Sequence, residues 1–357
     1  MADRAAYATL EAIRAAAQIR GSGSDAVLTY LIEAASREIE RAMHRWFVPR
    51  TETRQYSWPQ GSGNSYSLYL DADLLSVSTL TKEGENAVAI ASTDYFLEPV
   101  NEGPPYWRID IDRASNAFFD SDPNTPQRSI RVTGSWGYTN DTQAVGVTTS
   151  GLASDAAATT FETSQSDKIG IGDNLLIQSE QVYVTAKTSL DLGVNLHATT
   201  GALTADEADT NVLMTAAPTT AVRVGEVLRV DSEQLKVTAV NTTSDVEVER
   251  AYNGTTLASH AANADIFIYR TLTIERGVNG TTAATHANAT AVSRYFPPRD
   301  VEMLCIAEVI AAFQQQTSGW GRSVGTGEGQ REFSGRDLDR LRQSVVRRYR
   351  RNTIGVV

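Results

Sequence analysis

The stretch Ser24–Pro49, SDAVLTYLIEAASREIERAMHRWFVP, predicts a long amphipathic helix. Glu33 precedes Arg37 by one helical turn, an order that favours an exposed ion pair. Ser24 or Asp25 can cap the start, and Pro49 ends the helix. Because such a helix is only marginally stable alone in water, its apolar face needs partners elsewhere in the chain. The apolar side chains recur at helical spacing and are Leu28, Ile32, Ala35, Ile39, Met43 and Trp46.

Three other blocks have helical periodicity. Tyr7–Ile19 precedes the break at Gly21-Ser22-Gly23, and a last helix is expected after Ser334. Arg299–Gln316 is apolar on most sides, so several neighbours must cover it. Between residues 51 and 138, short β-type runs alternate with clusters of Gly, Asn, Pro and Asp. The expected strands are Thr51–Trp58, Tyr66–Leu70, Val77–Lys82, Val88–Ala91, Tyr95–Glu98, Trp107–Ile111 and Ser129–Tyr138.

The region from residue 140 to residue 295 is rich in Ala, Thr, Ser, Asn and Gly, and it repeats. The front motif IGDNLLIQSEQVYVTA (Ile171–Ala186) returns as VGEVLRVDSEQLKVTA (Val224–Ala239). The back motif ERAYNGTTLASHAANA (Glu249–Ala264) returns as ERGVNGTTAATHANAT (Glu275–Thr290). The order front, front, back, back fits one module nested inside another, which we favour. It also fits a tandem whose first back half has decayed around residues 193–195. Either arrangement predicts an all-β insertion.

These patterns predict an α+β fold: a helical-bundle core with a small β-sheet, plus an inserted all-β domain made of repeated motifs. The expected domains are residues 1–139 for the N-terminal part of the core, 140–295 for the inserted domain, and 296–357 for the C-terminal part of the core.

Composition restricts the classes of function. The chain has 357 residues, 41% of them hydrophobic, and no apolar run approaches the roughly 20 residues of a membrane helix. The start, MADRAAYATLEAI, lacks the apolar region of a secretory signal. A single cysteine, Cys305, rules out an intrachain disulfide. The net charge of −11 argues against wholesale coating of nucleic acid.

Several residues could carry chemistry, but each has a structural alternative that is more common. His260 and His286 occupy equivalent repeat positions without metal-spaced partners, so we expect a structural role for them, such as an imidazole bonded to a turn; the other histidines are His44 and His197. Cys305 lies in an apolar helix, where a thiol is inert. The pairs Asp71/Asp73 and Asp110/Asp112 could bind a cation or act as acid and base, but solvated edge carboxylates are commoner. Residues 319–329 are glycine-rich but lack the Lys-Ser/Thr end of a phosphate loop. We therefore assign no catalytic residue, cofactor or metal.

Arginine is concentrated near the end of the chain. From Arg331 to Arg351 there are eight arginines against three acids. They can form a solvated face at a helix C-terminus or contact an acidic partner or passing DNA phosphates. The candidate contact residues are Arg336, Arg340, Arg347, Arg348, Arg350 and Arg351.

The ordered pattern resembles the head–tail connector (adaptor, or head completion) proteins of long-tailed bacteriophages. The matching pieces are ATLEAIRAAAQI, the short Gly turn, LIEAASREIERAMHRWFVPRTE, LYLDADLLSVSTLT, DYFLEP, IRVTGSWGY and PPRDVEMLCIAEVIAAF. They cover roughly Leu10–Tyr138 and Pro297–Arg351. The repeated insertion departs from the compact pattern of this family.

The resemblance implies a structural virion neck protein without catalysis. Its subunits would form a ring of twelve copies below the portal protein, and DNA would pass through the hole. Further implied partners are a downstream neck or tail-terminator protein, the capsid, and genomic DNA in transient contact, with no membrane. The implied location is the virion neck, and the host cytoplasm during assembly. The alternative is a glycan-binding or glycan-cleaving tail component that acts through the inserted β domain.

Overall fold

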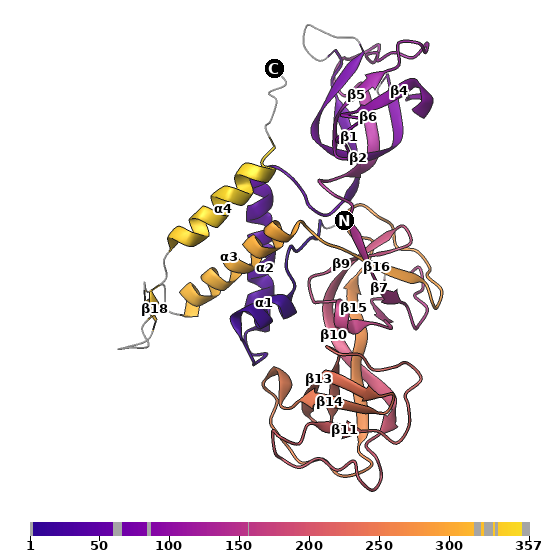
Figure 1. Cartoon of the computed structure of the whole chain (residues 1–357). Helices are drawn as coiled ribbons and strands as arrows, with labels where there is room; N and C mark the ends of the chain where they lie inside the picture. The colour runs from indigo at the N-terminus through magenta and orange to yellow at the C-terminus, as the bar shows by residue number, and fades with distance from the viewer. Residues whose placement is uncertain are drawn as a thin grey trace.

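The computed structural model describes residues 3–59, 66–83, 87–155, 157–317, 323–324, 331–332 and 335–351. The chain is mostly β: 37% of it is strand and 21% is helical. Figure 1 shows a layer of helices on one side and two sheets on the other, with the smaller sheet above the larger. A short hairpin pairs β17 (Ser323–Val324) with β18 (Arg331–Glu332). Two 3₁₀ turns, η2 (Ser92–Asp94) and η3 (Ser166–Lys168), lie in the connections.

The expectation of a helical-bundle core is wrong. The described residues contain four α-helices, and two large antiparallel sheets account for most of the regular structure. Residues 51–138 do not complete a helical core, because their strands enclose a separate hydrophobic cluster around Trp136, Leu74 and Ile130. The division of the chain into three domains stays a prediction.

The helical layer consists of α1 (Leu10–Ala17), α2 (Asp25–Met43), α3 (Arg299–Thr317) and α4 (Gly335–Tyr349). Its core also includes Tyr183 of β10 and Val278 in the loop after β15, so the layer and the outer half of the repeat region share one hydrophobic cluster. α3 buries only part of its surface, and Met303 stays 51% exposed.

The start of α2 differs from the sequence prediction. Ser24 precedes the helix, but its side chain makes no cap hydrogen bond. Glu33 does not pair with Arg37, because the Arg4 guanidinium lies 2.7 Å from Glu33 and Arg37 pairs with Glu40. Arg4, which is distant from α2 in the sequence, therefore pairs with Glu33 in place of Arg37.

The smaller sheet has the order β1 (Arg50–Tyr56), β6 (Ile130–Trp136), β2 (Ser67–Lys82), β5 (Tyr106–Ile111) and β4 (Tyr95–Glu98), with β3 (Val88–Ile90) paired to β2. The sequence predicted two strands where the structure has the single strand β2. A register shift between Tyr69 and Leu74 bends β2, so its first part pairs with β5 and most of its second part pairs with β6.

The larger sheet contains the repeats, and two long strands run through both of its halves. These strands are β10 (Glu180–Asn195) and β15 (Asp265–Glu275), which pair antiparallel. The outer half adds β7 (Thr142–Val147), β8 (Thr160–Glu162), β9 (Asn174–Ile177) and β16 (Ala291–Tyr295). The inner half adds β11 (Asn211–Leu213), β12 (Val227–Val230), β13 (Glu233–Thr242) and β14 (Asp245–Glu249), followed by the 3₁₀ turn η4 (Tyr252–Gly254).

The two halves have the same strand order, β8–β15–β10–β9–β16–β7 in the outer module and β11–β14–β13–β12–β15–β10 in the inner module. The contacts are those of nesting, not of a tandem. Glu180 of the first front motif binds Arg276 of the second back motif, whereas Glu233 of the second front motif binds Arg250 of the first back motif. The inner module therefore interrupts the outer one.

Candidate functional site

The predicted contact surface lies on α4. One face of this helix packs Leu338, Leu341, Val345 and Tyr349 against the helical layer, and Val345 is almost fully buried. Asp337 lies in the first turn and Arg347 in the last, which suits the helix dipole at both ends. The opposite face is therefore left to polar side chains.

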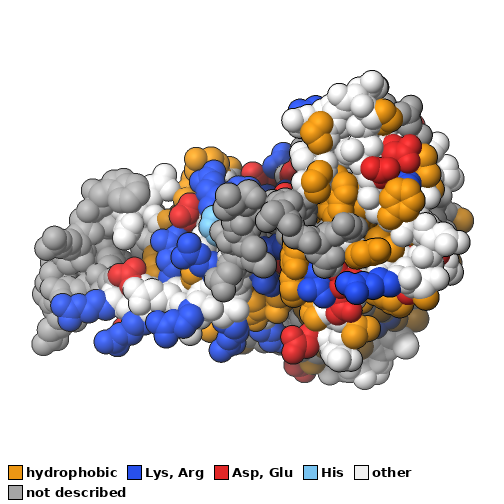
Figure 2. All heavy atoms as spheres, turned by 90° about the horizontal axis from the view of Figure 1, so that it is seen from above, with side chains coloured by type: hydrophobic (Ala, Val, Ile, Leu, Met, Phe, Trp, Pro, Cys, Tyr) orange, Lys and Arg blue, Asp and Glu red, His pale blue; other side chains and the backbone are white. Residues whose placement is uncertain are grey.

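Arg336, Arg340 and Arg347 of α4 have exposed side chains, and so does Arg350, which directly follows the last residue of the helix. Figure 2 shows Lys and Arg side chains gathered on the helical side of the molecule. Arg348 is also largely exposed, but its Nη1 atom lies 2.7 Å from Asp300 of α3. The Tyr349 hydroxyl donates to the other oxygen of the same carboxylate at 2.9 Å. α4 thus presents a row of cations while it is held at its end.

Arg351 does not belong to that row. It lies beyond the end of α4, is 8% exposed, and donates to the carbonyl oxygen of Leu70 at 2.7 Å. Its backbone N–H donates to the carbonyl of Met43, and its guanidinium lies 3.5 Å from Asp73. Arg351 therefore ties α4 to α2 and β2. The sequence could not distinguish it from the exposed arginines, because the run of Arg has no apolar neighbour at that point.

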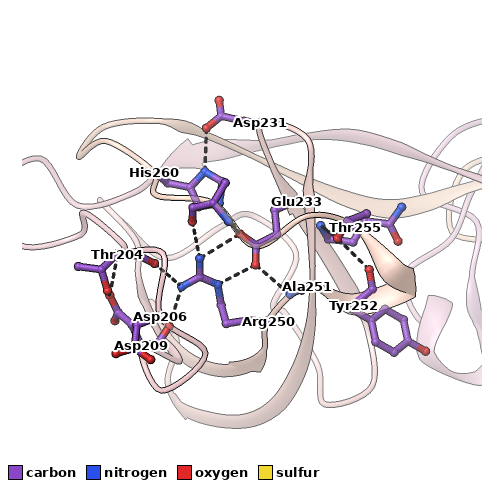
Figure 3. Close-up of polar contacts among 12 residues, drawn as sticks. Thr204, Asp206, Asp209, Asp231, Glu233, Arg250, Ala251, Tyr252, Thr255 and His260 are labelled. Atoms are coloured by element: carbon purple, nitrogen blue, oxygen red, sulfur yellow. Dashed lines mark hydrogen bonds and ion pairs between the residues drawn. The ribbon is translucent and has the colours of Figure 1, made fainter. Parts of the chain in front are cut away.

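The most densely bonded polar residues are ones that the sequence analysis did not single out. In the inner module, Arg250 binds both oxygens of Glu233, at 2.8 and 2.9 Å, and both side chains are buried (Figure 3). The backbone N–H groups of Ala251 and Ala258 and the His260 ring also reach this carboxylate. Glu233 thus holds the back motif onto the front motif.

His260 lies between two carboxylates, so it invites a catalytic interpretation. Its Nδ1 is 2.7 Å from Asp231 and its Nε2 is 2.9 Å from Glu233, and the ring is fully buried. A general base needs a free ring nitrogen within reach of substrate. Both nitrogens here are used internally, so the geometry is that of a structural histidine.

The outer module repeats the cluster. Arg276 binds both oxygens of Glu180 at 2.7 Å, and His286 lies 2.8 Å from the same carboxylate. The back-motif histidines were expected to have a structural role, such as a bond to a turn, and their rings bond to the buried front-motif glutamates. The motifs SEQ and ER, which are identical in both copies, were the available signal for these pairs.

The contacts shift the pKa of both glutamates in the same direction. Burial alone would raise the pKa of Glu233, but the hydrogen bonds from Arg250, the two backbone amides and His260 lower it to about 2. The same combination lowers the pKa of Glu180. Both groups are therefore held as carboxylates.

The stabilisation from Glu233 is expected to depend on pH. Because its folded-state pKa lies below the ordinary 4.5, the contribution is fully present above about pH 4.5 and is lost as the pH falls toward 2. Burial raises the pKa of Asp173 to about 6, so the contribution of this residue to stability changes with pH in the opposite direction. The measurement is the difference in unfolding free energy between the wild type and Glu233→Gln, in which Asp173 cancels. This difference should be constant from pH 7 to 5 and smaller at pH 3; a constant difference down to pH 3 would contradict the assignment.

The other predicted candidates are separate from one another. Burial raises the pKa of the Cys305 thiol to about 12, so it stays protonated. Asp71 pairs with Arg54, and Asp110 pairs with Arg108. His44 ends α2 on the surface, and His197 faces the hydroxyls of Thr199 and Thr200. Apart from β17, the glycine-rich segment 319–329 lies outside the described residues.

The described residues contain neither a cluster of metal ligands nor a helix that could span a membrane. They contain no group of three or more His, Cys, Asp or Glu side chains placed to hold a metal ion. In that same part of the chain, none of the helices has the length and apolar character needed to span a bilayer.

Comparison of the chain with protein-family models, with curated proteins and with solved structures finds no match.

Proposed function

We propose that this protein is a structural subunit of the neck of a long-tailed phage particle, which docks onto the portal ring through the arginine row of α4. The observation that carries the proposal is this row: Arg336, Arg340 and Arg347 on α4, and Arg350 directly after it, are exposed in a chain with a net charge of −11. An acidic chain with one basic helix suits docking onto a complementary acidic surface.

Incomplete coverage of the helical layer supports assembly with further copies. Tyr30 and Val27 on α2 are 70% and 36% exposed, and Met303 on α3 is 51% exposed. A neighbouring subunit in a ring would cover apolar side chains of this kind. The proposal does not need a helical-bundle core, since it places the contacts on α2, α3 and α4 and leaves the sheets as the scaffold.

The buried ion clusters fit a structural role better than a glycosidase. A glycosidase needs two accessible carboxylates that flank a sugar. The two carboxylates that bind both an arginine and a histidine, Glu180 and Glu233, are fully buried and saturated by donors.

The test is co-sedimentation with purified portal rings from the same particle. Replacing Arg336, Arg340, Arg347 and Arg350 together by alanine is expected to weaken binding by about tenfold or more, because exposed charges at an interface each contribute a fraction of a kcal/mol. The control replaces four equally exposed arginines outside α4, Arg20, Arg113, Arg128 and Arg223, and should change binding by less than about twofold.

Equal loss in both variants would show that overall charge, and not α4, governs binding. No binding of the wild-type chain to portal rings would overturn the proposal.

A further inference from the structure

Both repeat modules contain the same turn at the start of their front motifs. In the outer module the backbone N–H of Gly170 donates to the carboxylate of Asp173 at 2.7 Å. In the inner module the backbone N–H of Arg223 donates to the carboxylate of Glu226 at 2.9 Å. Asp173 and Glu226 are aligned by the repeat, so each carboxylate closes the turn of its own module.

The two carboxylates differ in the cation that reaches them. Arg270 binds both oxygens of Glu226, at 2.7 Å each. In the outer module the position of Arg270 is taken by Phe296. Asp173 has Arg294 instead, whose Nη1 atom lies 3.6 Å from the carboxylate, too far for a hydrogen bond. Asp173 is nevertheless only 7% exposed, so the outer module buries this carboxylate without a bidentate arginine.

The turn of the outer module is also where α1 is attached. The backbone N–H of Leu10 donates to the carbonyl of Ile171 at 2.9 Å, and the N–H of Ile171 donates to Glu11 at 2.8 Å. Gly170 has no room for a side chain, because a Cβ there would lie 2.5 Å from the Cβ of Thr9. The start of α1 therefore covers the turn.

A separate contact holds the chain before α1. Asn279 accepts from the backbone N–H of Arg4 and donates to its carbonyl, both at 2.9 Å, and Asn174 donates to the same carbonyl at 2.8 Å. These donors and acceptors are uncharged amides. The start of α1 can therefore leave the turn while Arg4 stays bound.

The charged groups around Asp173 do not compensate for its burial. Burial raises the pKa of Asp173 to about 6, although Arg294 of β16 and Lys187 of β10 lower it; Glu11 of α1 adds to the rise. Lys187 is itself paired with Glu11 at 3.2 Å. Because the folded-state pKa exceeds the ordinary 3.8, the closed turn is most stable with the proton bound. Its stability falls as the pH rises from about 4 to above 6.

We propose that residues 170–173 are a pH-dependent latch, which ties α1 to the outer module firmly while Asp173 is protonated and weakly once Asp173 is ionised. Departure of α1 brings water to the carboxylate, and water stabilises the charged form. The inner module needs no such departure, since Arg270 supplies the counter-charge of Glu226. One attachment between the helical layer and the repeat region therefore depends on pH.

Two measurements on the intact protein test the latch. Carbon-detected NMR of the Asp173 carboxyl group should give a titration midpoint near pH 6, and a midpoint near the ordinary value of about 4 would overturn the proposal. The second is hydrogen exchange of the Leu10 and Ile171 amides, corrected for the intrinsic rate at each pH. Protection in Asp173→Asn relative to the wild type should rise about tenfold between pH 5 and 7, because other titrating groups cancel in this ratio.

Variants and a reference amide locate the effect. Arg294→Gln should raise the midpoint of Asp173, because the carboxylate loses a cation that favours its charged form. Asp141→Asn, at an exposed aspartate before β7, should behave as the wild type. The amide of Glu226 in the inner turn is the internal reference, and its ratio should stay constant. The proposal is overturned if the ratio at Leu10 and Ile171 is constant from pH 5 to 7, or if the ratio at Glu226 changes with it.

Discussion

Replacing Glu233 by glutamine is expected to destabilise the protein by about 3–5 kcal/mol. The carboxylate accepts from Arg250, from two backbone amides and from His260, and its side chain is fully buried. Glutamine places an NH₂ group against these donors and leaves the buried Arg250 cation without a counter-charge. The free energy of unfolding, from urea titration at pH 7, measures the loss.

Asp231→Asn is the matched control for this substitution. Asp231 contacts the same His260, but its side chain is 65% exposed, so the loss should be less than about 1 kcal/mol. Glu180→Gln provides an internal comparison, since the outer module has the same cluster, and it should lose about as much as Glu233→Gln. A loss at Glu233 no greater than that at Asp231 would show that the buried pair does not hold the back motif onto the front motif.

These clusters also explain what the sequence could and could not predict. The repeats could be predicted from the two matching pairs of front and back motifs, and their strand-rich character from the alternation of β-branched residues. The sequence left nesting and a tandem both open, because it does not show which distant motifs pair in the folded protein. The structure shows nesting, since Arg250 binds Glu233 and Arg276 binds Glu180.

The helices illustrate the opposite case. Their existence could be predicted from the spacing of Leu28, Ile32 and Ile39, but their role as a bundle core could not, and that expectation was wrong. Periodicity says which face is buried and not what covers it. This layer is covered in part by Tyr183 of the larger sheet and by Val278 in the loop after β15. The same limit applies to α4, where Arg351 is buried although its sequence context matches that of the exposed arginines.

Tyr7→Ala is expected to cost about 3–5 kcal/mol, because Tyr7 is a large side chain buried to 1% exposure. Its ring meets Phe47 edge-on, with centroids 5.4 Å apart. Its hydroxyl donates to Glu40 at 2.6 Å and accepts from the backbone N–H of Phe47. Tyr30→Ala, 70% exposed on α2 of the same layer, is the control and should change stability by less than about 0.5 kcal/mol.

The position of Tyr7 makes the pattern of the loss more informative than its size. The residue anchors the segment that the outer module grips at Arg4, so its removal should expose amides in both the helical layer and the outer module. The inner module has no contact of this kind with Arg4 in the described chain, and the amides of β13 and β14 should keep their protection. Hydrogen exchange measures this difference directly. If β13 and β14 lost protection as much as β9 and β16, the two nested modules would unfold as one unit. Residues 3–9 would then stabilise the inner module as well as the helices and the outer module.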